Sequence, residues 1–181
     1  PQLPTFPDVH EAGITEPVQK FFDPMVVDLR PFEASKNFYF YQNRHGQVVF
    51  CVTPDPLITG IDERETSEFL PLASTRLVGI IPRLKNLRVR RVWRGIYPMS
   101  PDGSPLVGWS PAAKGLIHAT AMCGQGFMLG PGLGESLARI CTKGPDAVWD
   151  TSSADPLEVM DAYVLEEFAL DREFSAVEAL K

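Results

Sequence analysis

Residues 115–140, which read GLIHATAMCGQGFMLGPGLGESLARI, carry the strongest local indication of fold in this chain. Residues 115–122 are mostly apolar and predict a buried strand. The glycines of residues 124–134 follow directly, and apolar residues then recur at helical spacing as far as Ile140. Because Pro131 suits the first position of a helix, we predict a strand, a glycine-rich loop and a helix that begins near Pro131.

The glycine-rich loop has the chemistry of a ligand-binding turn. Glycines let a backbone approach a ligand closely, and a helix N-terminus offers unpaired N–H groups and about half a positive charge. This suits a phosphate, or the electron-rich edge of a ring that becomes anionic. The spacing differs from the dinucleotide motif G-x-G-x-x-G, because the glycine after Gly124 and Gly126 is Gly130, one position late, and no P-loop Gly-Lys-Ser/Thr follows. A purely structural turn is the alternative interpretation.

Two patterns in the first half of the chain predict a sheet and one helix. Residues 36–42 and 46–52 are aromatic or β-branched runs, and the turn residues 43–46 between them predict a hairpin. Residues 67–81 instead have apolar side chains at helical spacing and are followed by a proline, which predicts an amphipathic helix. Arg76 is the only charged residue in its apolar stripe.

The remaining segments complete an α+β prediction. The prolines of residues 1–13 predict an irregular lead-in, and residues 87–93 predict another strand. Residues 97–108 are rich in turn formers, and a last helix begins at Asp155, with Glu158 completing a capping box. Because strands surround few helices, we expect the α+β class with a largely antiparallel sheet.

Composition is that of an ordinary soluble globular domain. The chain has 181 residues, of which 44% are hydrophobic and 22% are charged, so disorder, a collagen-like chain and a disulfide scaffold are excluded. No apolar run approaches the roughly 20 residues that cross a bilayer. Three cysteines without C-x-x-C spacing favour reduced thiols, a cytoplasmic location and no metal site.

Charge is distributed unevenly along the chain. The net charge is −6, and the acidic residues concentrate after residue 145. A basic cluster precedes them, at Arg83, Lys85, Arg88, Arg90, Arg91 and Arg94. Nucleic-acid binding is one interpretation, but no stacking-aromatic motif or basic isoelectric point accompanies the cluster. We therefore favour a solvated strand face with Val89, Val92 and Trp93 turned inward, and we expect no nucleic-acid partner.

Few other side chains form a chemical constellation. His10, His45 and His118 are far apart, and His118 lies in an apolar strand, where a sheet residue is the favoured interpretation over a ligand or base. Cys123 borders the glycine loop, where a reactive thiol is conceivable, but we expect a small buried hydrophobe. No ligand spacing for a metal is present.

These segments together resemble a known family. The stretch Trp93–Gly108, WRGIYPMSPDGSPLVG, resembles the pattern W-x-G-x-x-x-x-T-P-D-x-x-P-x-I-G of FAD-dependent amine oxidoreductases, the D-amino-acid oxidase and sarcosine oxidase superfamily. Residues 124–135 resemble the C-terminal flavin loop and helix of that family, and Ile14–Pro17 resembles the opening of its substrate-domain sheet. Within that superfamily, the chain resembles sarcosine oxidase β-subunits and related dehydrogenase subunits.

The resemblance implies a domain organisation. Residues 14–98 would be a substrate-binding sheet and helix, residues 99–145 a flavin-capping segment that would complete an FAD domain, and residues 146–181 an acidic helical tail. Family members begin with a Rossmann unit that binds the FAD pyrophosphate. That unit is absent here, so we expect a C-terminal fragment whose partner is the N-terminal FAD-binding half of the same protein, and further subunits are also compatible with the resemblance.

The resemblance also implies roles for individual residues. The backbone of Gly124, Gln125, Gly126, Phe127 and Met128 would lie along the pyrimidine side of a non-covalently bound FAD, and Tyr97 and Gln125 would face the substrate as catalytic residues. Amino-acid oxidases have arginine at the Tyr97 position, and monomeric sarcosine oxidases have lysine at Met128 and a flavin-linking cysteine at Gly95. A histidine is also common where Gln125 stands. These differences exclude covalent flavin attachment at Gly95 and leave the substrate open.

The function implied by the resemblance is oxidation of a small amine or amino acid by hydride transfer to flavin N5, as in sarcosine oxidases and dehydrogenases. We expect this chain to be inactive alone, because the main FAD-binding unit is missing from it. The alternative is a non-catalytic subunit or interaction module derived from the substrate domain, which the missing arginine and lysine and the acidic tail favour.

Overall fold

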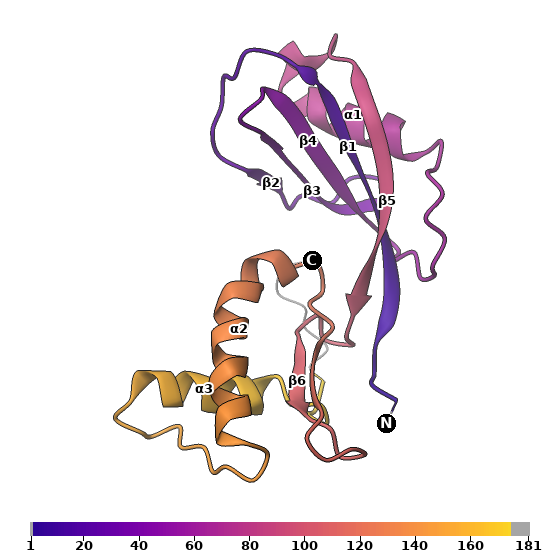
Figure 1. Cartoon of the computed structure of the whole chain (residues 1–181). Coiled ribbons are helices and arrows are strands. Elements are labelled where there is room, and N and C mark those ends of the chain that lie inside the picture. Colours follow the sequence, from indigo (N-terminus) through magenta and orange to yellow (C-terminus); the bar gives the residue numbers. More distant parts are fainter. Residues whose placement is uncertain (1, 175–181) are drawn as a thin grey trace. The chain divides into compact units, whose positions relative to one another are not determined.

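The computed structural model describes residues 2–174, which form two compact units. One unit contains residues 7–96, and the other contains residues 2–6 and 97–174. Strands β1 (Phe6–Pro17) and β5 (Val89–Met99) have residues in both units (Figure 1). Among the described residues, no helix is both long and apolar enough to cross a membrane.

The unit of residues 7–96 is built on a five-stranded sheet in the order β2-β3-β4-β1-β5. Strands β2 (Val26–Asp28), β3 (Ser35–Gln42) and β4 (Gln47–Pro54) follow β1 in the chain, and the pairs β2–β3, β3–β4 and β4–β1 are antiparallel. The predicted hairpin is confirmed, with Phe40 opposite Phe50. Gly46 has a φ of 84° in its turn, a conformation that favours glycine.

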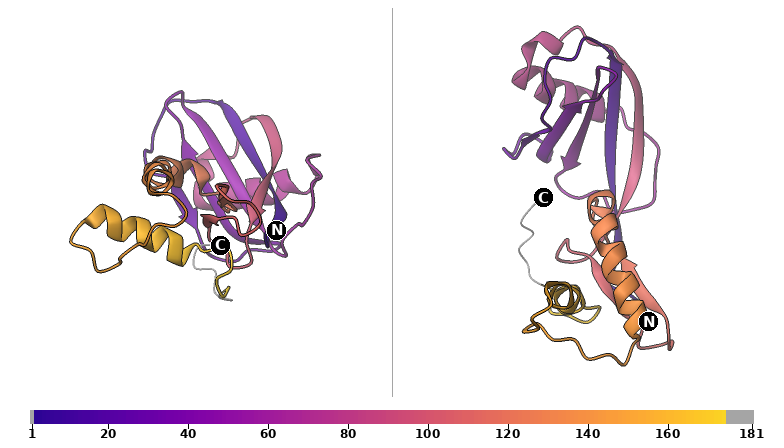
Figure 2. Two further views of the ribbon diagram at one scale, coloured as in Figure 1. Left: turned by 60° about the horizontal axis from the view of Figure 1, so that its bottom comes forward. Right: turned by 60° about the vertical axis from the view of Figure 1, so that its left-hand side comes forward.

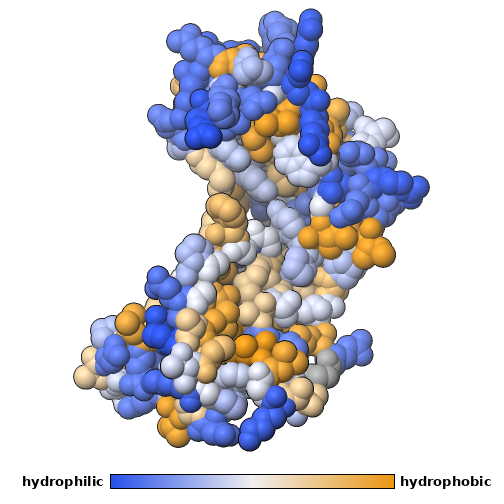
Figure 3. Space-filling model, in the orientation of Figure 1, coloured by the Kyte–Doolittle hydropathy of each residue, from blue (hydrophilic) through white to orange (hydrophobic). Residues whose placement is uncertain are grey.

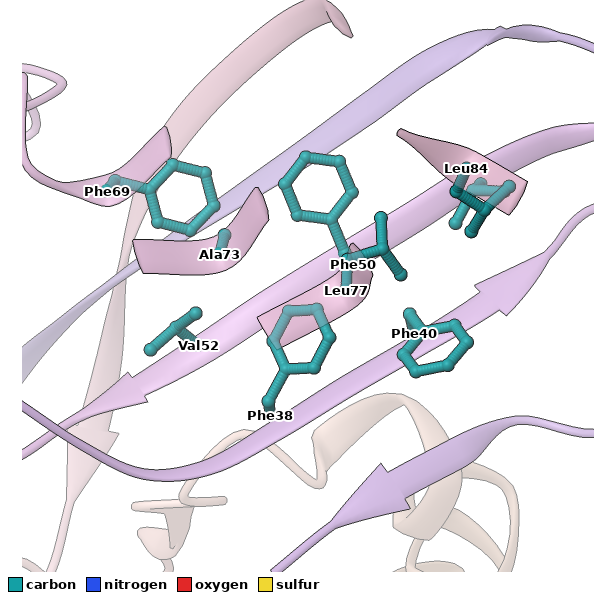
Figure 4. Packing of buried hydrophobic residues seen from close by; sticks show 9 residues of the cluster. Phe38, Phe40, Phe50, Val52, Phe69, Ala73, Leu77 and Leu84 are labelled. Carbon is teal, nitrogen blue, oxygen red and sulfur yellow. The ribbon is translucent and has the colours of Figure 1, made fainter. Parts of the chain in front are cut away.

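Helix α1 (Phe69–Ile80) packs on one face of this sheet, as its periodicity predicts. Alternate side chains of β3 and β4 point toward the helix (Figure 4). With residues of α1 and Leu84 they form a core of nine buried residues: Phe38, Phe40, Val48, Phe50, Val52, Phe69, Ala73, Leu77 and Leu84. The rings of Phe50 and Phe69 stack with centroids 5.9 Å apart. Leu84 comes from the 3₁₀ turn Pro82–Leu84 that ends the helix.

Arg76 is buried in the apolar stripe of α1, with 5% of its surface exposed. Its guanidinium donates to Ser35 Oγ at 2.8 Å and to the carbonyl oxygens of Asp28 and Arg30 at 3.1 and 2.8 Å. It also forms an ion pair with the Asp28 carboxylate at 3.3 Å. A hydrogen bond from the Arg30 side chain, with a further one from Arg76, holds the pKa of Asp28 well below its ordinary value. Arg76 therefore joins the helix to the chain between β2 and β3.

The other unit pairs a short sheet with two helices. Strands β6 (Leu106–Trp109) and β7 (Ile117–Thr120) are antiparallel, and α2 (Gly126–Lys143) and α3 (Pro156–Glu167) follow them (Figure 2). Its core contains Met99, Leu106, Ala121 and Cys123. The guanidinium of Arg139 on α2 donates to both carboxylate oxygens of Asp161 on α3, at 2.6 and 2.7 Å.

The structure confirms the α+β class and corrects several local predictions. The N-terminal segment is a strand from Phe6 rather than an irregular lead-in, and the strand expected at residues 87–93 continues to Met99 as β5. The last helix begins where predicted, with the Asp155 side chain as its cap, but Glu158 accepts from Ser153 and Lys143 instead of completing a capping box.

Two predictions of burial are also wrong. Strand β7 is shorter than residues 115–122 and mostly half-buried rather than buried. Val89 in the basic segment is 37% exposed, whereas Val92 and Trp93 are half-buried. The basic side chains nearby are mostly exposed, with Arg83 lying over the Phe21 ring at 4.5 Å.

Replacing Arg76 should strongly destabilise the unit of residues 7–96. In Arg76→Met, Ser35 Oγ and two carbonyl oxygens lose their donor, and Asp28 loses a buried partner. Breaking such a buried pair by removing one member costs about 3 kcal/mol of unfolding free energy. Urea unfolding followed by circular dichroism measures this loss. Arg64→Met, which removes an exposed ion pair with Asp62, is the control and should leave the midpoint nearly unchanged; equal effects would contradict the role given to Arg76.

Candidate functional site

The turn between β7 and α2 brings most of the predicted site residues together. Three residues of this turn have left-handed backbone angles: Ala121 with φ 53°, Cys123 with φ 50° and Gly124 with φ 82°. Two of them carry a side chain, which makes this conformation unfavourable without support from the surrounding structure. The Cys123 N–H donates to the carbonyl of Pro98 on β5 at 3.2 Å, so the turn is fixed to the strand that carries Tyr97.

Tyr97 packs directly on the backbone of Gly124. A Cβ built on Gly124 would collide with the Tyr97 ring, lying 2.9 Å from its Cδ2 and closer still to Cε2. Gly124 is exposed and Tyr97 half-buried. Glycine is therefore required at this position twice over, by the left-handed angle and by the ring. The structure thus places together two residues that the sequence assigns to one site.

Helix α2 begins at Gly126, five residues before the predicted start at Pro131. The residues expected in a loop, Gly126, Phe127 and Met128, form its first turn, and Pro131 lies inside the helix. Gln125 is the N-cap residue, and no side chain in the described part of the protein caps the helix. The first turn also holds no acidic residue. Within residues 2–174, neither a capping side chain nor an acidic residue of the first turn offsets the positive end of the helix dipole.

The first turn of α2 is open to solvent and apolar. Phe127 is 98% exposed and Met128 is 71% exposed, whereas Gln125 and Gly126 are half-buried. Farther along the helix, a Cβ on Gly130, Gly132 or Gly134 would meet nothing within 4 Å. In Figure 3 pale and hydrophobic residues lie beside hydrophilic ones in the region of α2. The N–H groups of Gln125 and Met128 donate to the carbonyls of Met122 and Gln125. The first helical residues, Gly126 and Phe127, combine backbone N–H groups with positive potential and nearby apolar side chains, which suits a flat, electron-rich ring edge.

The turn at residues 100–104 is held by a group of hydrogen bonds that the sequence did not reveal, which we call the Asp102–Arg172 staple. Ser100 Oγ donates to the Ser104 carbonyl at 2.6 Å, and the guanidinium of Arg172 donates to both oxygens of the Asp102 carboxylate at 2.7 and 2.9 Å. Arg172 also donates to the carbonyls of Pro105, Ser104 and Ala169. Burial opposes ionisation of Asp102, but hydrogen bonds from Arg172, Ser104 and Ser100 outweigh it and hold its pKa below the ordinary value. The only indication of this pair in the sequence was that Arg172 is an isolated basic residue in the acidic C-terminal segment.

Other candidate side chains lie outside this arrangement. Cys123 Sγ is buried and contacts the Ala121 carbonyl at 2.9 Å, in keeping with a structural residue. Burial raises the pKa of the Cys51 thiol to about 11, which disfavours its thiolate form. His118 lies on β7 opposite Gly108. His10 forms a buried pair with Asp8 at 2.8 Å on β1. Among residues 2–174, no group of three or more His, Cys, Asp or Glu side chains could hold a metal ion.

Residues 1–140 match the model of the DAO family, described as FAD dependent oxidoreductase. This chain belongs to that family. The resemblance found in the sequence is thereby confirmed, and FAD is the cofactor of this family.

Relatives of known identity agree with this assignment. The chain is 29% identical over 143 residues to sarcosine oxidase subunit beta of Rhizobium meliloti (strain 1021), covering 79% of this chain and 33% of the relative. It is 28% identical over 104 residues to glycine oxidase of Bacillus subtilis (strain 168), covering 56% and 27%. The chain therefore spans about a third of the length of the curated relatives that it matches.

Solved structures of the family share the fold. L-proline dehydrogenase from P. horikoshii superimposes with a TM-score of 0.71 at 32% identity, over 93% of this chain and 42% of that one. Glycine oxidase from Geobacillus kaustophilus superimposes with a TM-score of 0.72 at 19% identity, over 96% and 41%, which is a likeness of fold.

The residues of the α2 end fit the family's cofactor. An isoalloxazine ring is flat and apolar over most of its area, and its pyrimidine edge gains negative charge on reduction. The backbone at Gly124 carries no side chain, the helix end has no carboxylate, and Phe127 and Met128 offer apolar surface. Gly95 carries no group that could link a flavin covalently.

Adding one methyl group at Gly124 should disturb the turn. Gly124→Ala would force alanine into a left-handed conformation, at about 1–2 kcal/mol, and would press its Cβ into the Tyr97 ring. We expect a loss of about 2–4 kcal/mol in unfolding free energy, measured by urea denaturation. The control is Gly132→Ala, where the Cβ has open space in a helix and should stabilise by about 0.5–1 kcal/mol. Equal responses of the two variants would contradict the contact.

The Asp102–Arg172 staple should make this unit sensitive to acid. The folded-state pKa of Asp102 lies below the ordinary value of 3.8, so its contribution to stability is full above that value and is lost as the pH falls through the folded pKa. Asp102→Asn should therefore lower the unfolding free energy at pH 7, and the difference from the unchanged protein should narrow below about pH 4. Urea titrations at pH 7, 5 and 3 measure it. Asp146→Asn, at an exposed residue, should follow the unchanged protein at each pH.

Proposed function

We propose that this chain is the flavin-capping and substrate-domain part of a DAO-family enzyme that oxidises a small amine or amino acid. The observation that carries the proposal is the N-terminus of α2, which is exposed and has no side-chain cap. It begins two residues after Gly124, the glycine on which the Tyr97 ring packs. A helix end without a carboxylate is suited to stabilise negative charge that develops on a neighbouring ring.

Each proposed site residue has a distinct task. The backbone of Gly124, Gly126, Phe127 and Met128, together with that of Gln125, would lie along the pyrimidine edge of the flavin. The N–H groups of Gln125 and Met128 already donate to the carbonyls of Met122 and Gln125, at 2.7 and 3.0 Å, so the N–H groups of the other three residues would bind the ring edge. The Tyr97 hydroxyl and the Gln125 amide would face the substrate, where a hydroxyl and an amide can orient an amine through hydrogen bonds. When bound, FAD would accept the hydride from the carbon beside the amine nitrogen at its N5. Exposed Phe127 and Met128 would exclude water from the ring.

A secondary amine of the sarcosine type is the proposed substrate class. Matched relatives include a sarcosine oxidase subunit and an L-proline dehydrogenase, whose named substrates are both secondary amino acids. No basic side chain stands at Tyr97 or Met128 to hold a carboxylate, so a group elsewhere in the whole protein would bind it.

The proposed setting is a larger assembly in the cytoplasm. The first partner would be the N-terminal FAD-binding half of the same protein, since the chain spans about a third of its curated relatives. Further subunits are suggested by the relative named as a β-subunit. The free thiols of Cys51, Cys123 and Cys141 are in keeping with a reducing compartment.

The test uses the whole protein that contains this chain, purified with its flavin. Sarcosine, L-proline, glycine and D-alanine are added without oxygen, and bleaching of the flavin absorbance is followed. We expect sarcosine or L-proline to bleach the flavin, and Tyr97→Phe and Gln125→Ala to lower the rate of bleaching at least tenfold, the loss expected when a positioned hydrogen bond at the reacting group is removed.

Two outcomes would contradict the proposal. Tyr163→Phe, at an exposed ring on α3, is the matched control, and an equal loss there would show that the effect is not local to the site. A whole protein that holds no flavin, or flavin that no amine reduces, would instead favour the alternative of a non-catalytic subunit or interaction module.

A further inference from the structure

A cavity of about 700 Å³ lies entirely within the unit of residues 7–96, and nothing in the proposed flavin chemistry uses it. It is bounded by β1, the end of β4, the segment that links β4 to α1, and the first turns of α1. Apolar side chains make up much of its wall, among them Val9, Val52, Leu57, Phe69 and Leu72. This volume is within the range of sites that bind small molecules.

The charged residues that line the cavity are all acidic. Glu11, Glu33, Asp55 and Glu68 contribute carboxylates to its lining, whereas no lysine, arginine or histidine does. In Figure 3 a hydrophobic area bordered by hydrophilic residues lies over the segment that links β4 to α1. An apolar cavity with one sign of charge at its edge concentrates ligands of the opposite charge.

Glu11 has a structural task that keeps the cavity formed. It is a buried residue of β1, and its two carboxylate oxygens accept from the Thr66 N–H and the Thr66 hydroxyl, each at 2.7 Å. This pair fixes the linking segment to the sheet shortly before α1 begins. This buried carboxylate therefore joins parts of the cavity wall that lie 55 residues apart in the sequence, in addition to the backbone hydrogen bond from the Val9 N–H to the Ile58 carbonyl at 2.9 Å.

The other three carboxylates are available to a ligand. Glu33, Asp55 and Glu68 are exposed, and within residues 2–174 none of them forms an ion pair. Glu68 stands at the N-cap position of α1 but its side chain does not cap the helix. Three carboxylates at the edge of an apolar cavity, without an ion-pair partner among the described residues, are complementary to a cation with an apolar body.

We propose that this cavity binds a small organic cation, an ammonium group carried on an apolar chain or ring. The ammonium group lies among Glu33, Asp55 and Glu68, and the apolar body lies against Val52, Phe69 and Leu72. Charge complementarity selects the cation, and the size of the cavity selects a small molecule over a longer peptide. All residues of this site belong to the unit of residues 7–96, whereas the α2 end belongs to the other unit.

Binding to the full chain tests this proposal, with 4-phenylbutylammonium as the probe and 4-phenylbutanol as its neutral counterpart. Isothermal titration gives the affinities, and amide chemical shifts locate the site. We expect the ammonium compound to bind at least tenfold more tightly than the alcohol, to shift residues around the cavity, and to lose this advantage in 0.5 M salt. Equal affinities, or shifts centred elsewhere, would overturn the proposal.

Two variants separate the contributions of charge and space. Glu33→Gln/Asp55→Asn/Glu68→Gln should remove the preference for the cation and leave weak binding of the alcohol. Ala34→Trp, which places a large ring at the cavity wall, should abolish binding of both probes. The charge-matched control Asp23→Asn/Glu135→Gln/Asp146→Asn alters no lining residue and should bind as the unchanged chain does.

The remaining outcomes distinguish other occupants. Binding of a lysine-rich peptide in the absence of binding by 4-phenylbutylammonium would overturn the proposal and assign the cavity to a protein segment. Tyr97→Phe and Gln125→Ala should leave probe binding unchanged, so a failure of the flavin proposal and a failure of this one give different results.

Discussion

The Tyr97 ring packs against the backbone of Gly124 and leaves no space for a side chain there. This contact constrains the unit that contains residues 97–174. At this contact the chain leaves β7 through a left-handed turn, in which Ala121 and Cys123 also take unfavourable backbone angles. The hydrogen bond from Cys123 to Pro98 and the staple of Asp102 by Arg172 keep both sides of the contact in place. The direction of α2 follows from that turn.

Local pattern was sufficient to predict the hairpin and α1, since each of these elements is defined by neighbours in sequence. Alternating aromatic residues and Gly46 specify β3, β4 and their turn, and an apolar stripe specifies α1. The start of α2 was predicted five residues late because Pro131 is favourable at a first helical position. Within the helix, the proline removes only the bond to the carbonyl of Phe127, which lies in the exposed first turn. The prolines of residues 1–13 predicted an irregular segment where β1 lies. Pro7 is compatible with this strand because it precedes the residues that pair with β4 and so disrupts no hydrogen bond between the two strands.

The polar pairs that fix the site and the sheet could not be predicted, because they join residues far apart in the chain. Arg172 meets Asp102 across 70 residues, and Arg76 meets Ser35 across 41. The sequence around each arginine does not indicate its partner, because Arg172 lies in an acidic segment and Arg76 lies in the apolar stripe of a helix. The candidate site was found from glycines, whose backbone freedom shows in the sequence, while the residues that support it depend on tertiary packing.

The stability of α2 is distributed unequally along its length. Its C-terminal half contributes the buried residues Ser136 and Ile140 and the pair of Arg139 with Asp161. Its N-terminal half contains Gly126, Gly130, Gly132 and Gly134, each of which costs about 1 kcal/mol of helix propensity relative to alanine, and it begins without a cap. The N-terminal end of α2, which we propose to contact the flavin, is therefore the end that the described residues stabilise least. A ligand that accepts hydrogen bonds from the Gly126 and Phe127 N–H groups binds the folded helix and not the unfolded chain, so its binding free energy adds to the stability of the turn and the helix together.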